Sequence, residues 1–178
     1  MNKSFYIETF GCQMNKNDSE LMRLSLYDEG YTLSEKIDEA DIAVYNTCSV
    51  REHAEDRVRA RIASDQGRIR KRGGLIVVAG CMAQRIGGEL IEDKTADVVI
   101  GPYQSPAIGK KLNEYFLNKT ACLFLSQSAE DFESRFRGYP ASWHSWLTIT
   151  HGCGNFCAYC IVPYVRGRLM SFNSTDII

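Results

Sequence analysis

Apolar runs separated by longer charged segments form the main pattern in the first two thirds of the chain. The runs rich in β-branched and aromatic residues predict strands at residues 3–10, 41–47, 75–79 and 97–101. The capping and stop signals between them predict helices at residues 18–29, 51–70, 82–91 and 106–118. Three of the strands are continuous apolar runs, which is typical of strands covered on both faces.

Strands that alternate with helices in this way predict an α/β fold with an open parallel sheet flanked by helices. The 178 residues suffice for one full domain and a part of another. We expect a first domain at residues 1–118, a polar connector at 119–142 and the start of a second domain at 143–178. A further strand is predicted at residues 146–150.

Charge and composition narrow the possible environments and partners. The net charge of −1 excludes a global attraction to polyanions, so nucleic acid would have to bind at a local patch. The N-terminus lacks the apolar core and cleavage site of a secretion signal, and no apolar run is long enough to span a bilayer. We therefore expect a cytoplasmic protein without a membrane partner, whose seven cysteines serve metal binding or catalysis rather than disulfides.

Three of these cysteines are closely spaced near the C-terminus, with no fourth after them. Cys153, Cys157 and Cys160 could hold three corners of a metal centre and leave one coordination position open to another ligand. This favours an iron-sulfur cluster with a chemical role. The alternatives are three packed thiols, or a zinc knuckle completed by His151 or His144.

A second set of three cysteines is dispersed in sequence, but each member directly follows a predicted strand. Because the carboxyl ends of parallel strands lie along one edge, Cys12, Cys48 and Cys81 can converge there. Three thiolates again suggest an iron-sulfur cluster with one open iron. Zinc with a nonprotein fourth ligand, or three small residues that merely fill strand ends, are the alternatives. Cys122 lies in an apolar run and is interpreted as a structural buried thiol.

Arginines gather in two places that could meet anions. The predicted helix at 51–70 and the residues just after it carry a surplus of positive charge that could contact RNA phosphates, although a solvated face with internal ion pairs is the ordinary interpretation. Arg166 and Arg168 follow the closely spaced cysteines and are better placed to meet an anionic substrate or cofactor.

The cysteine motifs and their surroundings resemble those of the methylthiotransferase family. The runs that resemble its N-terminal domain are YIETFGCQMN at 6–15, NTCSVRE at 46–52 and GCMAQR at 80–85. The run from 152 to 168 is similar to the radical S-adenosylmethionine (SAM) motif of the same family. Ser49 and Tyr164 favour the tRNA-modifying MiaB branch over the branch that modifies a ribosomal-protein aspartate.

The resemblance implies a Rossmann- or flavodoxin-like first domain, the start of a radical SAM β/α barrel, two [4Fe-4S] clusters and SAM. The implied cluster ligands are Cys12, Cys48 and Cys81 for one cluster and Cys153, Cys157 and Cys160 for the other. Tyr159 would lie beside the adenine of SAM. The implied reaction adds a methylthio group to C2 of isopentenyladenosine next to the tRNA anticodon. A reduced flavodoxin or ferredoxin-type protein would supply the electrons.

Two departures from the family pattern limit this expectation. The sequence ends eighteen residues after Cys160, so we expect an N-terminal part that is inactive alone. The tail at 169–173 also lacks the acidic residue and Ser-Arg pair usual in the family. A noncatalytic iron-sulfur or zinc-binding module, or an aspartate methylthiotransferase acting on a ribosomal protein, are the alternative functions.

Overall fold

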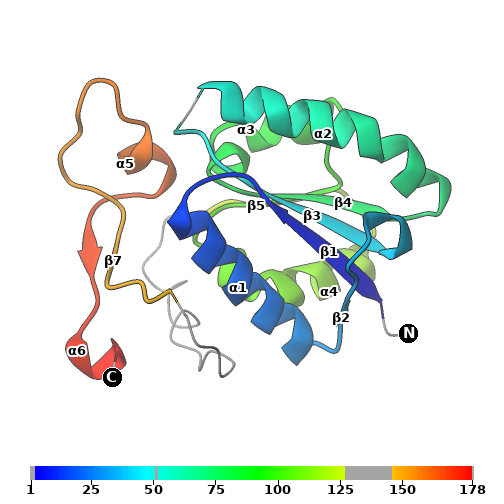
Figure 1. The fold of residues 1–178 in the computed structure, drawn as a ribbon, viewed down its shortest axis with the longest axis horizontal. Helices are drawn as coiled ribbons and strands as arrows, with labels where there is room; N and C mark the ends of the chain where they lie inside the picture. Colours follow the sequence, from blue (N-terminus) through cyan, green and yellow to red (C-terminus); the bar gives the residue numbers. More distant parts are fainter. Residues whose placement is uncertain (1–2, 51, 127–145, 178) are drawn as a thin grey trace.

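A six-stranded parallel sheet forms the centre of the molecule (Figure 1). The computed structural model describes residues 3–50, 52–126 and 146–177. The strands are β1 (Ser4–Thr9), β2 (Thr32–Leu33), β3 (Ile42–Thr47), β4 (Leu75–Gly80), β5 (Val98–Ile100) and β6 (Cys122–Phe124). Their spatial order is β2-β1-β3-β4-β5-β6, and every neighbouring pair is parallel. The α/β fold class predicted from the sequence is confirmed.

Helices cover both faces of this sheet, as continuous apolar strands require. The helices α1 (Gln13–Asp28) and α4 (Ile108–Asn118) lie on one face, and α2 (Glu52–Lys71) and α3 (Cys81–Glu92) on the other (Figure 1). Each face has its own apolar core, and every residue of β3 and β4 is buried between the two.

The strand order creates a switch point between β1 and β3. The chain moves outward from β1 to β2 in one direction, then returns to the other side of β1 with β3 and continues outward. This is the flavodoxin-like order, and such sheets bind ligands at the carboxyl ends of the two strands that flank the switch point. Cys12 and Cys48 follow these two strands.

Several predicted boundaries were wrong, for local reasons. Helix α1 begins at Gln13, and Asp18 is buried inside the helix instead of capping it. Only the end of the strand predicted at 146–150 is extended, because β7 (Thr150–His151) pairs with a partner, β8 (Met170–Ser171), of only two residues. A strand forms only where a second strand can satisfy its backbone.

The sequence did not predict the shorter elements. These are β2, β8, the 3₁₀-helix η1 (Ile37–Glu39), and the helices α5 (Val162–Val165) and α6 (Ser174–Ile177). The helix predicted at 106–118 is a 3₁₀-helix, η2 (Ser105–Ala107), followed by α4. Strand β6 lies within the predicted connector and forms the last strand of the large sheet, and residues 127–142 of that connector lie outside the described residues. The boundaries at 118 and 142 stay a prediction.

The segment from residue 146 onward packs against the carboxyl edge of the large sheet (Figure 1). The Asn17 side-chain amide donates to Thr148 Oγ1 at 2.7 Å, and the Tyr103 hydroxyl donates to the Arg166 carbonyl at 3.1 Å. Gly167 has a φ of +69° and lies so close to the Tyr103 hydroxyl that a Cβ would collide with it. The two parts of the chain are therefore closely fitted at this edge.

Candidate metal centre

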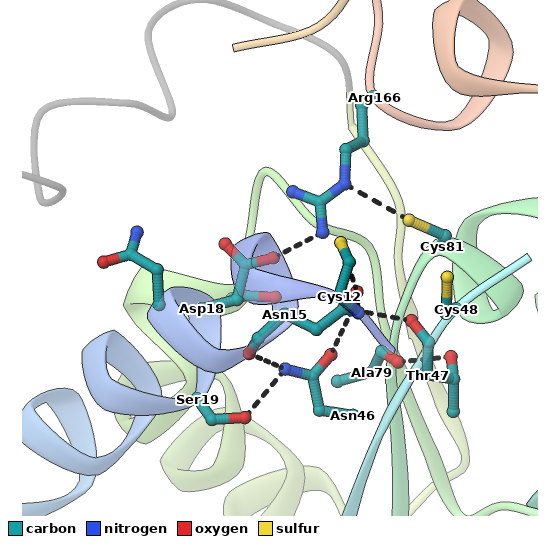
Figure 2. Close-up of polar contacts among 12 residues, drawn as sticks. Cys12, Asn15, Asp18, Ser19, Asn46, Thr47, Cys48, Ala79, Cys81 and Arg166 are labelled. Carbon is teal, nitrogen blue, oxygen red and sulfur yellow. Dashed lines mark hydrogen bonds and ion pairs between the residues drawn. The ribbon is translucent and has the colours of Figure 1, made fainter. Parts of the chain in front are cut away.

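The three dispersed cysteines come together at the carboxyl edge of three adjacent strands. Thr47 of β3 is in register with Gly80 of β4, so Cys48 and Cys81 leave the sheet at the same level. Cys12 is close to Cys48, since a Cβ built on the preceding Gly11 would lie 3.0 Å from Cys48 Cβ. Figure 2 shows the three side chains at this edge. The predicted convergence of Cys12, Cys48 and Cys81, called the first trio below, is thus observed.

Asn15 explains why Cys12 is held at this place. Cys12 occupies the N-cap of α1, and Asn15 Oδ1 accepts from the Cys12 backbone N–H at 3.4 Å and from its thiol at 3.5 Å. The Asn15 side-chain amide donates to Asn46 Oδ1 at 3.1 Å and to the Thr47 carbonyl at 2.9 Å. One buried side chain therefore joins the start of α1 to the end of β3, beside Cys48.

A second set of buried hydrogen bonds fixes the neighbouring strand ends. The Asn46 side chain donates to the Asn15 carbonyl at 2.7 Å and to Ser19 Oγ at 2.8 Å. The Thr47 hydroxyl donates to the Ala79 carbonyl at 2.6 Å, just before Cys81 (Figure 2). Buried polar groups that satisfy one another specify one arrangement of the surrounding backbone. The three strand ends are held together without help from the sulfur atoms.

Arg166 covers the first trio from the C-terminal segment (Figure 2). Its side chain is buried, with Nε 3.2 Å from Cys81 Sγ and Nη2 2.7 Å from a carboxylate oxygen of Asp18. Asp18 is itself fully buried. Arg166 Nη1 is buried and has no hydrogen-bond partner within the described part of the chain.

The electrostatics of this edge favour negative charge on sulfur. Cys12 caps α1 and Cys81 is the first residue of α3, so two thiols lie at the positive ends of helices. Burial raises the pKa of the Cys81 thiol, and the charge and hydrogen bond of Arg166 oppose that increase. Burial alone would lower the pKa of Arg166, but Asp18 and Cys81 raise it above its ordinary value, so Arg166 stays charged.

Each sulfur of the first trio has its own neighbour in this structure. Cys12 contacts Asn15, Cys81 contacts Arg166, and the Val50 N–H donates to Cys48 Sγ at 3.5 Å. Accordingly, across residues 3–50, 52–126 and 146–177, no three His, Cys, Asp or Glu side chains are arranged so that they could hold a metal ion. The donors nevertheless fit an anionic metal-sulfur group, since three thiols and a buried guanidinium N–H that donates to Cys81 share this edge.

The closely spaced cysteines, called the second trio below, lie in a loop that approaches the first trio. The Cys153 N–H donates to the Gly167 carbonyl at 3.1 Å, and the Cys160 N–H donates to the Cys157 carbonyl at 2.9 Å. Cys157 is exposed, and Cys153 and Cys160 are partly buried. A short path of contacts therefore runs from Cys153 through Gly167 to its neighbour Arg166, and from there to Cys81.

Three predictions about single residues or pairs have different outcomes. Tyr159 is 92% exposed, so its predicted contact with an adenine stays a prediction. Arg168 is exposed as expected for a residue that meets an anion, whereas Arg166 is buried against the first trio. Cys122 was predicted to be a buried structural thiol, but it is only partly buried: it packs against one apolar core, and its thiol donates to the Thr120 carbonyl at 3.0 Å.

The arginines of α2 mostly pair with acidic groups of the same domain. Arg59 contacts Glu89 and Asp93, and Arg70 contacts Asp97 at 3.0 Å. Arg61 and Arg68 also form ion pairs within the domain. The ordinary interpretation, a solvated helix face with ion pairs, therefore accounts for these four side chains. Within the described residues, no helix has the length and apolar character needed to cross a membrane.

A cavity of about 220 Å³ opens next to the first trio. Its lining consists of Gln13, Met14, Asn17 and residues 146–150. It thus lies between the start of α1, directly after Cys12, and the chain that leads into the second trio. The volume is below the range of roughly 300–1,000 Å³ common for sites that enclose a whole small molecule.

Comparisons with known proteins agree with the motifs. Curated relatives named tRNA-2-methylthio-N(6)-dimethylallyladenosine synthase are 43% identical in Dictyoglomus thermophilum, 39% in Thermosipho africanus and 41% in Geobacter sulfurreducens. These alignments cover 98–99% of this chain but only 39–41% of the relatives, so the chain spans about two fifths of their length. The model of the family described as "Uncharacterized protein family UPF0004" matches residues 4–101, more than half of the chain. The resemblance identified from the cysteine motifs is thereby confirmed, and the chain belongs to the UPF0004 family.

Proposed function

We propose that this chain is the cluster-bearing part of a tRNA methylthiotransferase, which adds a methylthio group to C2 of isopentenyladenosine beside the anticodon. The observation that carries the proposal is a path of contacts that joins the two cysteine trios. Arg166 contacts Cys81 of the first trio, while the next residue, Gly167, accepts a hydrogen bond from Cys153 of the second. The names of the relatives support the tRNA substrate.

The residue types fit two iron-sulfur clusters, each with one iron free for another ligand. Cys12, Cys48 and Cys81 would hold one cluster, and Cys153, Cys157 and Cys160 the other. Together with SAM, the clusters would supply the electron for reductive SAM cleavage and the sulfur that receives a methyl group. By the family resemblance, Tyr159 would lie beside the adenine of SAM, and its ring is 92% exposed.

The protein's own contribution would be to hold the two centres at a fixed separation and to orient the base. The hydrogen bonds Asn17–Thr148 and Tyr103–Arg166 keep the second trio's segment on the carboxyl edge. The cavity between the start of α1 and residues 146–150 has room for part of a nucleotide. The proposal also includes a reduced flavodoxin or ferredoxin-type protein as the electron donor. It places the protein in the cytoplasm.

Nucleoside analysis tests this proposal directly. Bacteria that lack the modification would express the protein in a form that spans the full length of its relatives. Mass spectrometry of digested tRNA is expected to show methylthiolated isopentenyladenosine, and the form with Cys12, Cys48 and Cys81 replaced by alanine is expected to show none. Methylthiolation of a ribosomal-protein aspartate instead, or stoichiometric zinc in the purified protein, would contradict the proposal.

A further inference from the structure

We propose that Arg166 is a positioning residue that links the two trios and donates a hydrogen bond to the anionic group held by the first trio. The inference rests on the proposed function, because it takes that group to be a metal-sulfur cluster. Within the described residues, Arg166 is the only arginine whose side chain contacts a thiol of either trio, namely that of Cys81.

The burial of Arg166 and its contact with Cys81 are the first argument. Arg166 has a relative exposure of only 4%, and two of its three nitrogens are engaged by Cys81 and Asp18. Nη1 is buried without a partner within the described residues. Nε already donates to Cys81 Sγ, so an anionic group held by the first trio would accept a hydrogen bond from Arg166 through that sulfur.

The backbone around Arg166 is the second argument, because it fixes the guanidinium independently of the cysteines. The Arg166 N–H donates to the Val162 carbonyl at 2.8 Å, and the Arg166 carbonyl accepts from the Tyr103 hydroxyl. Gly167 is confined by Tyr103, and Gly152 is confined by the carbonyls of residues 166–168. The side chain therefore enters the domain from a fixed point, which is the condition for positioning a second group.

The chemistry of guanidinium explains why arginine suits this place. Its planar fork presents N–H groups in several fixed directions, so one side chain can bond a carboxylate, a thiolate sulfur and a further acceptor. Asp18 keeps the pair neutral overall, while Nε still donates its N–H to Cys81 Sγ. Hydrogen bonds to sulfur stabilise the more negative, reduced state of an iron-sulfur cluster and so raise its reduction potential.

The test measures how much cluster the first trio holds and the midpoint potential of that cluster. If Arg166 only stabilised the fold, its replacement would not change both quantities together. In a background where Cys153, Cys157 and Cys160 are alanine, only the first trio can hold a cluster. Wild-type Arg166, R166K and R166Q are reconstituted anaerobically with iron and sulfide, and iron content and midpoint potential are measured. The matched control is R70Q, which removes an arginine of a surface ion pair with Asp97. Circular dichroism checks that each variant is folded.

We expect R166Q to retain at most half of the wild-type iron, and to have a lower midpoint potential in what remains. R166K retains the charge but not the fork, so it should shift in the same direction by a smaller amount, and R70Q should match the wild type. If R166Q fails to fold, the iron content and midpoint potential of R166K decide whether the inference holds. A folded R166Q or R166K with wild-type iron content and potential would overturn the inference alone. A wild-type chain that binds no iron would overturn the proposed function and the inference with it.

Discussion

The buried ion pair between Asp18 and Arg166 gives the most specific stability prediction. Asp18 is fully buried and Arg166 nearly so, with 2.7 Å between Nη2 and the carboxylate. Removal of one partner from a buried pair leaves an uncompensated charge and costs about 3–5 kcal/mol, whereas replacement of both partners is often nearly neutral. The single variants D18N and R166Q should therefore each be strongly destabilised, and the double variant D18N/R166Q much less.

A double-mutant cycle in the metal-free chain measures this coupling. Urea unfolding followed by circular dichroism gives the free energy of unfolding for the wild type, both single variants and the double variant. We expect the summed losses in the free energy of unfolding of the two single variants to exceed the loss of the double variant by at least about 2 kcal/mol. The exposed pair Lys36–Glu39 provides a control cycle, for which about 0–1 kcal/mol is expected. Additive losses at Asp18 and Arg166 would refute the assigned ion pair.

Three further changes test the surroundings of the first trio and of β1. N15A removes the bonds that join α1 to β3 and should lower the free energy of unfolding by about 1–3 kcal/mol in urea. G167A meets the Tyr103 hydroxyl at a positive φ, and should lower the melting temperature. A backbone N–H of β1 donates to Asp41 and lowers its pKa, so this stabilisation is present above the ordinary pKa and is lost as the pH falls. D41N should accordingly lose less stability between about pH 6 and about pH 3 than the wild type does.

The results that would contradict these expectations are equally specific. An N15A variant as stable as the wild type would mean that Asn15 does not join the two elements. A G167A variant with an unchanged melting temperature would mean that the segment after residue 146 does not pack on Tyr103 as observed. If the stability of D41N fell with pH as much as that of the wild type, Asp41 would not contribute to the loss of stability in acid.

The sheet was predictable because the sequences of its central strands are apolar runs that indicate buried strands by themselves. Residues 75–79 form an uninterrupted apolar run, and burial between two helical layers requires such a run. The convergence of the first trio could be predicted only conditionally, since Cys12, Cys48 and Cys81 meet only if their strands are neighbours. Strand order depends on contacts between segments distant in sequence, and local patterns do not contain that information.

The polar groups around the first trio were not identified in advance. Asp18 has the residue type of a helix cap, and only the hydrogen bonds between Cys12 and Asn15 show that α1 starts five residues earlier. Asn46 lies within β3, one residue before its end, and no local sequence pattern marks it as part of a hydrogen-bond network. Arg166 was expected to meet an anion, but its partner Asp18 lies 148 positions away in sequence. Such pairs become visible only in three dimensions.

Iron bound by each trio separately is the most direct test of the central claim, that two incomplete thiol sets each hold a cluster. Anaerobically reconstituted chains would be analysed for iron and sulfide as the wild type, with the first trio replaced by alanine, and with the second trio replaced by alanine. We predict about eight irons for the wild type and about four for each triple variant, as two four-iron clusters require. Full iron content after replacement of Cys12, Cys48 and Cys81 would contradict the account.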